Sequence, residues 1–94
     1  MSGERMTARI RGRVQGVGFR WWVRQRAEAL GLTGWVMNAD DERSVELVAE
    51  GEPTDLDELE RLVNRGPQGA RVEAVEARRS PATGEFDGFG IVRS

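Results

Sequence analysis

The sequence predicts an α+β fold of the ferredoxin-like type, an α/β sandwich in which two helices cover one face of an antiparallel sheet. Its hydrophobic periodicity changes between that of strands and that of helices in the order β-α-β-β-α-β, and a short extra strand follows at the C-terminal end. Two strand-helix-strand halves in this order are typical of a split βαβ arrangement. Because 94 residues can build one hydrophobic core and not two, we expect a single domain over residues 1–94, with a loose tail at residues 1–5.

The first strand and the first helix occupy the first third of the chain. Apolar and polar residues alternate over residues 6–14, which predicts a half-buried strand. Apolar residues at helical spacing run over residues 19–30 and predict the first helix. Gly31 follows the last of them and is expected to end this helix as a C-cap.

Two strands joined by a polar turn come next. Residues 33–37 predict a short second strand. Residues 44–50 predict a third strand that alternates between an apolar face and a face that carries Glu46, Val48 and Glu50. The polar residues 39–43 between them are expected to form the turn.

The second helix is predicted between two pairs of helix-breaking residues. Leucines at helical spacing follow Gly51 and Pro53, and Gly66-Pro67 ends the pattern. Thr54 and Asp57 resemble a capping box, which places the start of the helix there. Asp57 and Arg61 are expected to form an i,i+4 ion pair that contributes about 0.3–0.5 kcal/mol.

The last two strands complete the sheet. Residues 70–79 predict a fourth strand whose alternation slips between Val72 and Val75, as at a β-bulge. Residues 80–88 are expected to form a loop, and residues 89–92 a short terminal strand. In this fold the first and second strands run parallel with the third between them. Their C-terminal ends therefore lie at one edge of the sheet, about 10 Å apart, which brings the turn after the first strand close to Asn38.

The composition excludes several kinds of chemistry. The chain has no His, no Cys and no Tyr, and its basic residues are all Arg. These absences exclude His general bases, thiolate nucleophiles, Schiff-base lysines and the P-loop lysine. An enzyme with this composition has to act mainly by positioning its substrate and by electrostatic stabilisation. The net charge is −2, but Arg5 to Arg26 forms a basic segment that contains no acidic residue.

A glycine-rich stretch lies inside this basic segment. The turn from Gln15 to Phe19 joins the first strand to the first helix, and Arg20 follows it directly. A turn of this kind can direct several backbone N–H groups into one concavity at the positive end of a helix, which suits an anion. An adjacent guanidinium matches the oxygens of phosphate or carboxylate, so we expect an oxyanion site.

Two motifs in the chain resemble those of the acylphosphatase family. The segment Gly12–Arg20 resembles the family signature G-x-V-Q-G-V-x-F-R, and Gly34–Asn38 is similar to its G-W-V-x-N segment. The resemblance extends from about Thr7 to Ile91, and further family positions are Val45-Glu46, Glu50-Gly51, Gly66-Pro67 and Ala70-Arg71-Val72. It implies a ferredoxin-like hydrolase that splits acyl phosphates into a carboxylate and inorganic phosphate, with no metal and no other cofactor.

The resemblance also implies the roles of individual residues. Arg20 and Asn38 are the expected catalytic residues: Arg20 binds the phosphoryl group, and Asn38 holds the attacking water through its side-chain amide. The N–H groups of the loop are expected to share the phosphoryl oxygens with Arg20; the loop residues are Gln15, Gly16, Val17, Gly18 and Phe19. No metal-binding residue is expected.

The expected partner is a small-molecule acyl phosphate, with inorganic phosphate as product and competitive inhibitor. We expect no nucleic-acid partner and no membrane association. The N-terminal residues lack an apolar segment, and we expect a cytoplasmic monomer.

The chain departs from the family pattern at two places. The turn after Asn38 is one residue longer than is usual in the family, lacks Gly and carries the acidic residues Asp40, Asp41 and Glu42. We interpret these acids as a solvated turn in preference to a metal-binding run. At the C-terminal end, Arg93 stands one residue after the position at which the family often has Arg.

Two other classes of function are compatible with the predicted fold. Ferredoxin-like sandwiches also bind RNA through aromatic residues on the sheet face, but this chain lacks that aromatic-rich pattern. A non-catalytic anion-binding or regulatory domain would keep the glycine loop but would not need Asn38. We interpret Arg9, Arg11 and Arg13 as a solvated sheet face in preference to a binding stripe.

Overall fold

The computed structural model describes residues 3–93, which form five strands and two helices. In chain order these are β1 (Glu4–Arg13), α1 (Phe19–Ala29), β2 (Thr33–Asn38), β3 (Ser44–Gly51), α2 (Pro53–Arg65), β4 (Arg71–Pro81) and β5 (Phe89–Val92). The expected tail at residues 1–5 is wrong for Glu4 and Arg5, because both pair with β3 and β4 as part of β1. The first two residues of that expected tail lie outside the described residues.

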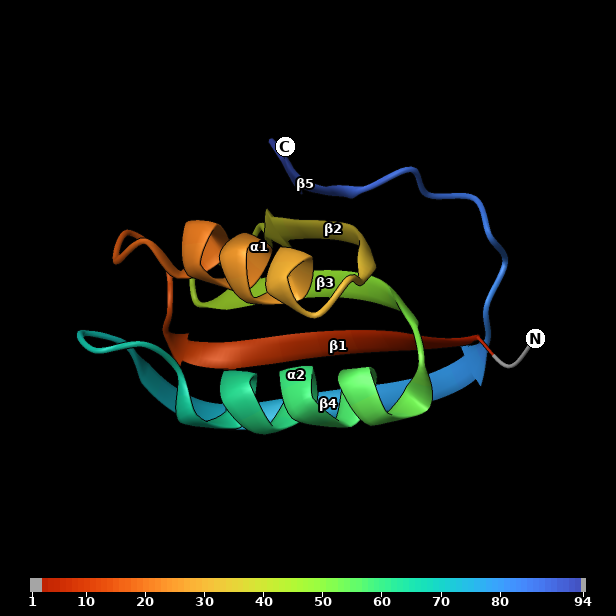
Figure 1. Ribbon diagram of the computed structural model, residues 1–94. Coiled ribbons are helices and arrows are strands. Elements are labelled where there is room, and N and C mark those ends of the chain that lie inside the picture. The colour runs from red at the N-terminus through yellow and green to blue at the C-terminus, as the bar shows by residue number, and fades with distance from the viewer. Residues whose placement is uncertain (1–2, 94) are drawn as a thin grey trace.

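The strands form one sheet in the order β4-β1-β3-β2-β5, and both helices lie on the same face of it (Figure 1). The predicted ferredoxin-like sandwich is confirmed, with β3 between β1 and β2. Neighbouring strands from β4 to β2 are antiparallel, but β5 runs parallel to β2, so the sheet is mixed and not antiparallel throughout. No helix in the described part of the chain is long and apolar enough to cross a membrane.

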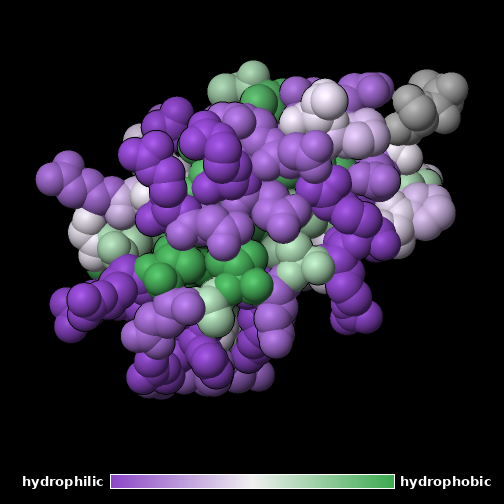
Figure 2. All heavy atoms as spheres, turned by 90° about the horizontal axis from the view of Figure 1, so that it is seen from below, coloured by the Kyte–Doolittle hydropathy of each residue, from purple (hydrophilic) through white to green (hydrophobic). Residues whose placement is uncertain are grey.

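The core lies between the sheet and the two helices. The apolar face of β1 supplies Met6, Ala8 and Ile10, none of them more than 2% exposed. Three residues from each helix pack against this face, namely Phe19, Val23, Ala27, Leu56, Leu59 and Val63. From the side of β4, hydrophilic side chains cover most of the surface and a hydrophobic patch shows between them (Figure 2).

The predicted bulge is present in β4. The pairing of β1 with β4 shifts between Arg11 and Gly12, so that Glu73 is the additional residue in β4. Gly12 has φ 143°, and a Cβ there would lie 2.0 Å from the carbonyl oxygen of Arg71. The glycine that opens the first motif is therefore required by the close approach of these two strands.

Two predictions about α2 are wrong. The helix begins at Pro53 with Glu52 as its N-cap and has no side-chain cap, because Pro53 occupies the first helical turn ahead of Thr54. The pair between Asp57 and Arg61 does not form. Arg61 instead pairs with Glu58 at 2.6 Å, while Asp57 accepts a hydrogen bond from Arg79 at 2.9 Å.

On the face of β3 that was expected to be polar, Glu46 is partly exposed but the other two residues are buried. Val48 and Glu50 are 6% and 4% exposed. The chain between β4 and β5 runs around one end of the sheet (Figure 1), and Glu50 holds its middle. The Glu50 carboxylate accepts hydrogen bonds from the N–H groups of Thr83 at 3.0 Å and Gly84 at 2.9 Å, and from Arg5 Nε at 2.7 Å. These hydrogen bonds fix the connecting segment on the sheet, and the chain then pairs with β2 as β5.

Burial raises the pKa of the Glu50 carboxyl, but the hydrogen bonds from Thr83, Gly84 and Arg5 outweigh it and bring the pKa down to about 2. We expect Glu50→Gln to lower the free energy of unfolding by about 2–4 kcal/mol at pH 7, measured by urea denaturation. A group whose pKa is lowered on folding loses its contribution as the pH falls from its ordinary pKa, 4.5, toward 2. The difference from wild type should therefore shrink over that range.

The matched control is Glu76→Gln, because Glu76 is exposed on β4. This variant should change the free energy of unfolding by less than about 0.5 kcal/mol. A Glu50→Gln deficit that stayed constant from pH 6 to pH 2 would contradict the role of the ionised carboxylate.

Candidate active site

A cleft of about 160 Å³ lies at the edge of the sheet where β1, β2 and β5 end. Because β1 and β2 run parallel, the loop after β1 and the last residue of β2 come to the same edge, as the sequence predicts. The cleft is lined by Val14, Gly16, Gly18, Phe19, Arg20, Trp21, Asn38, Ile91 and Arg93. No carboxylate from the described residues lines it.

The loop between β1 and α1 forms one wall. Gly16 and Gly18 both have φ 76°, in the left-handed region, and a Cβ at either position would meet no atom within 4 Å. The backbone turn, and not crowding, therefore favours glycine at these two positions. Gly18 is the N-cap of α1 and offers no side-chain cap to the first turn. With no side-chain cap from the described residues, the N–H groups at this positive helix end can donate to an anion.

Arg20 is the second residue of α1 and is half-buried at the cleft. Among residues 3–93 it has no ion-pair or hydrogen-bond partner, whereas Arg5, Arg9 and Arg79 are held by carboxylates. Its guanidinium can therefore bind an anion without first breaking an internal ion pair.

Asn38 ends β2 on the opposite wall. Its Oδ1 is buried and has no hydrogen-bond partner among the described residues. A buried polar atom without a partner costs about 1–3 kcal/mol and is uncommon in a folded protein. The hydrogen-bonding capacity of this oxygen is thus not used by the described part of the fold.

Arg93 is a lining residue that was not among the predicted site residues. Met37 pairs with Val92 in the parallel ladder of β2 and β5. Asn38 and Arg93 are the next residues of the two segments, and both line the cleft. The sequence predicted the terminal strand, but it gave no indication that this strand pairs with β2. Arg93, which directly follows β5, therefore lines the cleft beside Asn38.

The other predicted loop residues take different positions. The Gln15 side chain turns to the β2–β3 turn, where Nε2 donates to the carbonyl oxygens of Ala39 and Ser44. The side chain of Phe19 belongs to the core, and the partly buried side chain of Val17 packs against it. Only the backbone N–H groups of these three residues are thus available for an anion, and these N–H groups are the predicted phosphoryl ligands.

The acidic turn after Asn38 does not place charge in the cleft. Asp41 accepts hydrogen bonds from the Arg43 N–H at 2.9 Å and the Ser44 hydroxyl at 2.8 Å, and it pairs with Arg9 at 3.0 Å. The hydrogen bonds from Arg43 and Ser44 are the main causes that lower the pKa of the Asp41 carboxyl to about 2. No group of three or more possible metal ligands occurs among the described residues.

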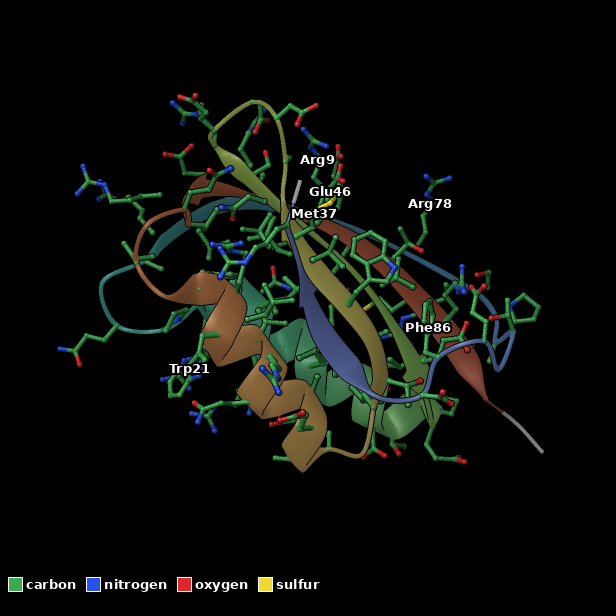
Figure 3. The ribbon with its side chains drawn as sticks, turned by 90° about the horizontal axis from the view of Figure 1, so that it is seen from above. Arg9, Trp21, Met37, Glu46, Arg78 and Phe86 are labelled. Carbon is green, nitrogen blue, oxygen red and sulfur yellow. The ribbon has the colours of Figure 1, made fainter. Side chains whose placement is uncertain are left out.

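The arginines of β1 lie outside the site. Arg9 pairs with Glu46 and Asp41 on the sheet face away from the helices, where Figure 3 also shows Met37, Arg78 and Phe86. Trp21, which is 59% exposed, projects from α1 on the other side of the sheet. It lies at the rim of the cleft and not in the core.

The cleft thus combines the N–H groups of the loop, two arginines and one amide oxygen that has no partner among residues 3–93. All the charged groups are donors, and neither Arg nor Asn can act as a base near neutral pH. This arrangement can bind a tetrahedral oxyanion and orient a water molecule beside it.

Comparison with known proteins gives a consistent result. The family model described as acylphosphatase matches residues 6–91. The chain is 51% identical over 89 residues to an acylphosphatase of Thermobifida fusca, covering 95% of this chain and 97% of the relative. It is 53% identical over 91 residues to one of Salinibacter ruber, covering 96% and 94%.

A solved structure agrees in fold. The crystal structure of acylphosphatase from Bacillus subtilis superimposes with a TM-score of 0.90 at 35% sequence identity, covering 95% of this chain and 98% of that one. The family match spans both motifs and nearly the whole length of the chain. This chain therefore belongs to the acylphosphatase family.

Proposed function

We propose that the protein hydrolyses acyl phosphates by the attack of a water molecule, oriented by Asn38, on a phosphoryl group held by Arg20 and the loop N–H groups. The hydrolysis itself is the activity of its family. The observation that carries the mechanism is the shared cleft, which Arg20 and Asn38 both line; among residues 3–93, neither the Arg20 guanidinium nor Asn38 Oδ1 has a hydrogen-bond partner.

The phosphoryl oxygens occupy the loop between β1 and α1. The N–H groups of Gln15 to Phe19 and the Arg20 guanidinium donate to these oxygens, which carry most of the charge in the transition state of phosphoryl transfer. The donors are in place before the substrate binds. Stabilisation of the transition state therefore requires little reorganisation of the protein.

Water held at the Asn38 amide attacks phosphorus in line with the acyl oxygen. A bond forms between the water oxygen and phosphorus, and the bond from phosphorus to the acyl oxygen breaks. The electron pair of the broken bond leaves with the carboxylate. Because a carboxylate is a stable leaving group, it needs no general acid, and a phosphate oxygen of the substrate takes the proton of the water.

Several properties follow as part of the proposal. The reaction needs no metal and no other cofactor, since the donors that stabilise the charge belong to the chain. Inorganic phosphate competes with the substrate, because it fits the same loop. The protein acts as a cytoplasmic monomer whose single domain spans residues 1–94.

The test is hydrolysis of a generic acyl phosphate by the purified protein, with and without inorganic phosphate. We expect turnover that EDTA leaves unchanged and phosphate inhibits competitively. Asp41 and Glu50, whose pKa values are lowered to about 2, stay ionised near neutrality. After correction for ionisation of the substrate, kcat should therefore be nearly flat from about pH 5 to pH 8.

Other results would contradict the proposal. A steep step in kcat near neutral pH would indicate a titrating base that this cleft does not contain. Phosphate binding without any turnover would indicate the non-catalytic anion-binding domain instead.

A further inference from the structure

Gln15 connects the phosphate loop to the turn that follows Asn38. Its Nε2 donates to the carbonyl oxygen of Ala39 at 3.1 Å and to that of Ser44 at 2.8 Å. Both partners are acceptors, so only the NH₂ end of the amide can face them, and both of its hydrogens are used. The side chain is half-buried and does not line the cleft.

The two acceptors close the β2–β3 turn. The Ala39 N–H donates to the Ser44 carbonyl oxygen at 2.9 Å, and Ala39 directly follows Asn38, which pairs with Val45 at the end of the ladder. Inside the turn, Asp41 holds Ser44 and Arg43. Among the described residues, the Gln15 side chain therefore joins this well-held turn to the loop whose N–H groups are proposed to bind phosphate.

We infer that Gln15 is a positioning residue for Asn38: it sets the distance between the loop that holds the phosphoryl group and the strand end that holds the attacking water. This inference rests on the proposed function. In-line attack requires the reacting atoms at about 3–3.5 Å, and a displacement of about 1 Å can cost 10²-fold in rate. Loss of the Gln15 contact should therefore slow the chemical step and leave phosphate binding intact.

The test variant is Gln15→Met, which keeps the length and neutrality of the side chain but removes both donors. We expect kcat to fall about tenfold or more, while KM and the inhibition constant of inorganic phosphate change less than about twofold. Gln25→Met is the matched control, because Gln25 is exposed on α1 and outside the cleft. It should leave kcat, KM and phosphate inhibition as in wild type.

A double-mutant cycle separates positioning from general destabilisation. In the Asn38→Ala background, Gln15→Met should lower kcat by less than about twofold further, since its effect acts through the missing amide. All rates are measured well below the Tm of each variant. A tenfold loss that persists without Asn38 would overturn the inference.

NMR gives a second readout that does not depend on residual activity. The side-chain amide signals of Asn38 should shift or broaden in Gln15→Met, while phosphate still shifts the backbone signals of residues 16–20. Unchanged Asn38 signals would overturn the inference. If Asn38→Ala itself left kcat unchanged, the proposed function would fail; if it slowed kcat but Gln15→Met did not, only the role of Gln15 would fail.

Discussion

Arg20→Lys is expected to lower kcat/KM for a generic acyl phosphate by about 10³-fold or more and to weaken phosphate inhibition strongly. Lysine keeps the positive charge but replaces a planar fork of donors with one point charge, which cannot hold two phosphoryl oxygens in fixed directions. Loss of one preorganised donor alone costs about 10²–10³-fold in rate. Arg20 has no internal ion pair in the described part of the chain, so the fold should tolerate the change.

Arg24→Lys provides the control on the same helix. Arg24 is exposed, its Nε lies 3.5 Å from Glu28, and it does not line the cleft. This variant should retain wild-type kcat/KM and phosphate inhibition. If Arg20→Lys also retained wild-type activity at an unchanged Tm, the guanidinium would not be the phosphoryl ligand.

Asn38→Ala is expected to lower kcat by about 10²-fold while KM and phosphate inhibition stay nearly unchanged, because the variant loses the water holder and keeps the phosphate loop. The thermal midpoint should stay level or rise. Oδ1 is buried without a partner among residues 3–93, so its removal relieves a cost of about 1–3 kcal/mol that offsets the loss of packing. A residue that costs stability and supports turnover is typical of a functional site.

Asn64→Ala is the matched control for this variant. Asn64 lies exposed on α2, where its Nδ2 donates to the Glu60 carbonyl oxygen at 2.8 Å, and it does not line the cleft. It should not change kcat. A loss of phosphate inhibition in Asn38→Ala would show instead that Asn38 binds the phosphoryl group.

Local sequence patterns predicted most of the elements because the strands and helices are amphipathic, with apolar residues at regular spacing. The alternation in β1 and the stripe in α1 follow directly from which side of each element faces the core. The bulge in β4 was also visible, since an additional residue shifts the alternation. The capping box failed because Thr54 and Asp57 fit a local motif, whereas Pro53 occupies the first turn of the helix and Arg79 of β4 binds Asp57.

The cleft was predictable to the extent that strand order places the loop after β1 beside the end of β2. Arg20 and Asn38 lie where that order puts them, and their catalytic roles stay predictions. Arg93 could not be placed, because a four-residue strand carries no signal for its neighbour. The burial of Glu50 was hidden for a similar reason: its partners, Thr83 and Gly84, are more than thirty residues away.

The sequence by itself determined the order of the elements, the faces that pack into the core, the two motifs and the exclusion of His, Cys and Lys chemistry. These depend on composition and on spacing between near neighbours. Tertiary structure alone decided that β5 lies parallel to β2, that Gln15 binds the turn after Asn38 and that the acidic turn lies outside the cleft. The reason is physical. Hydrogen bonds between distant segments depend on how the strands are arranged in the sheet, and local periodicity does not encode that arrangement.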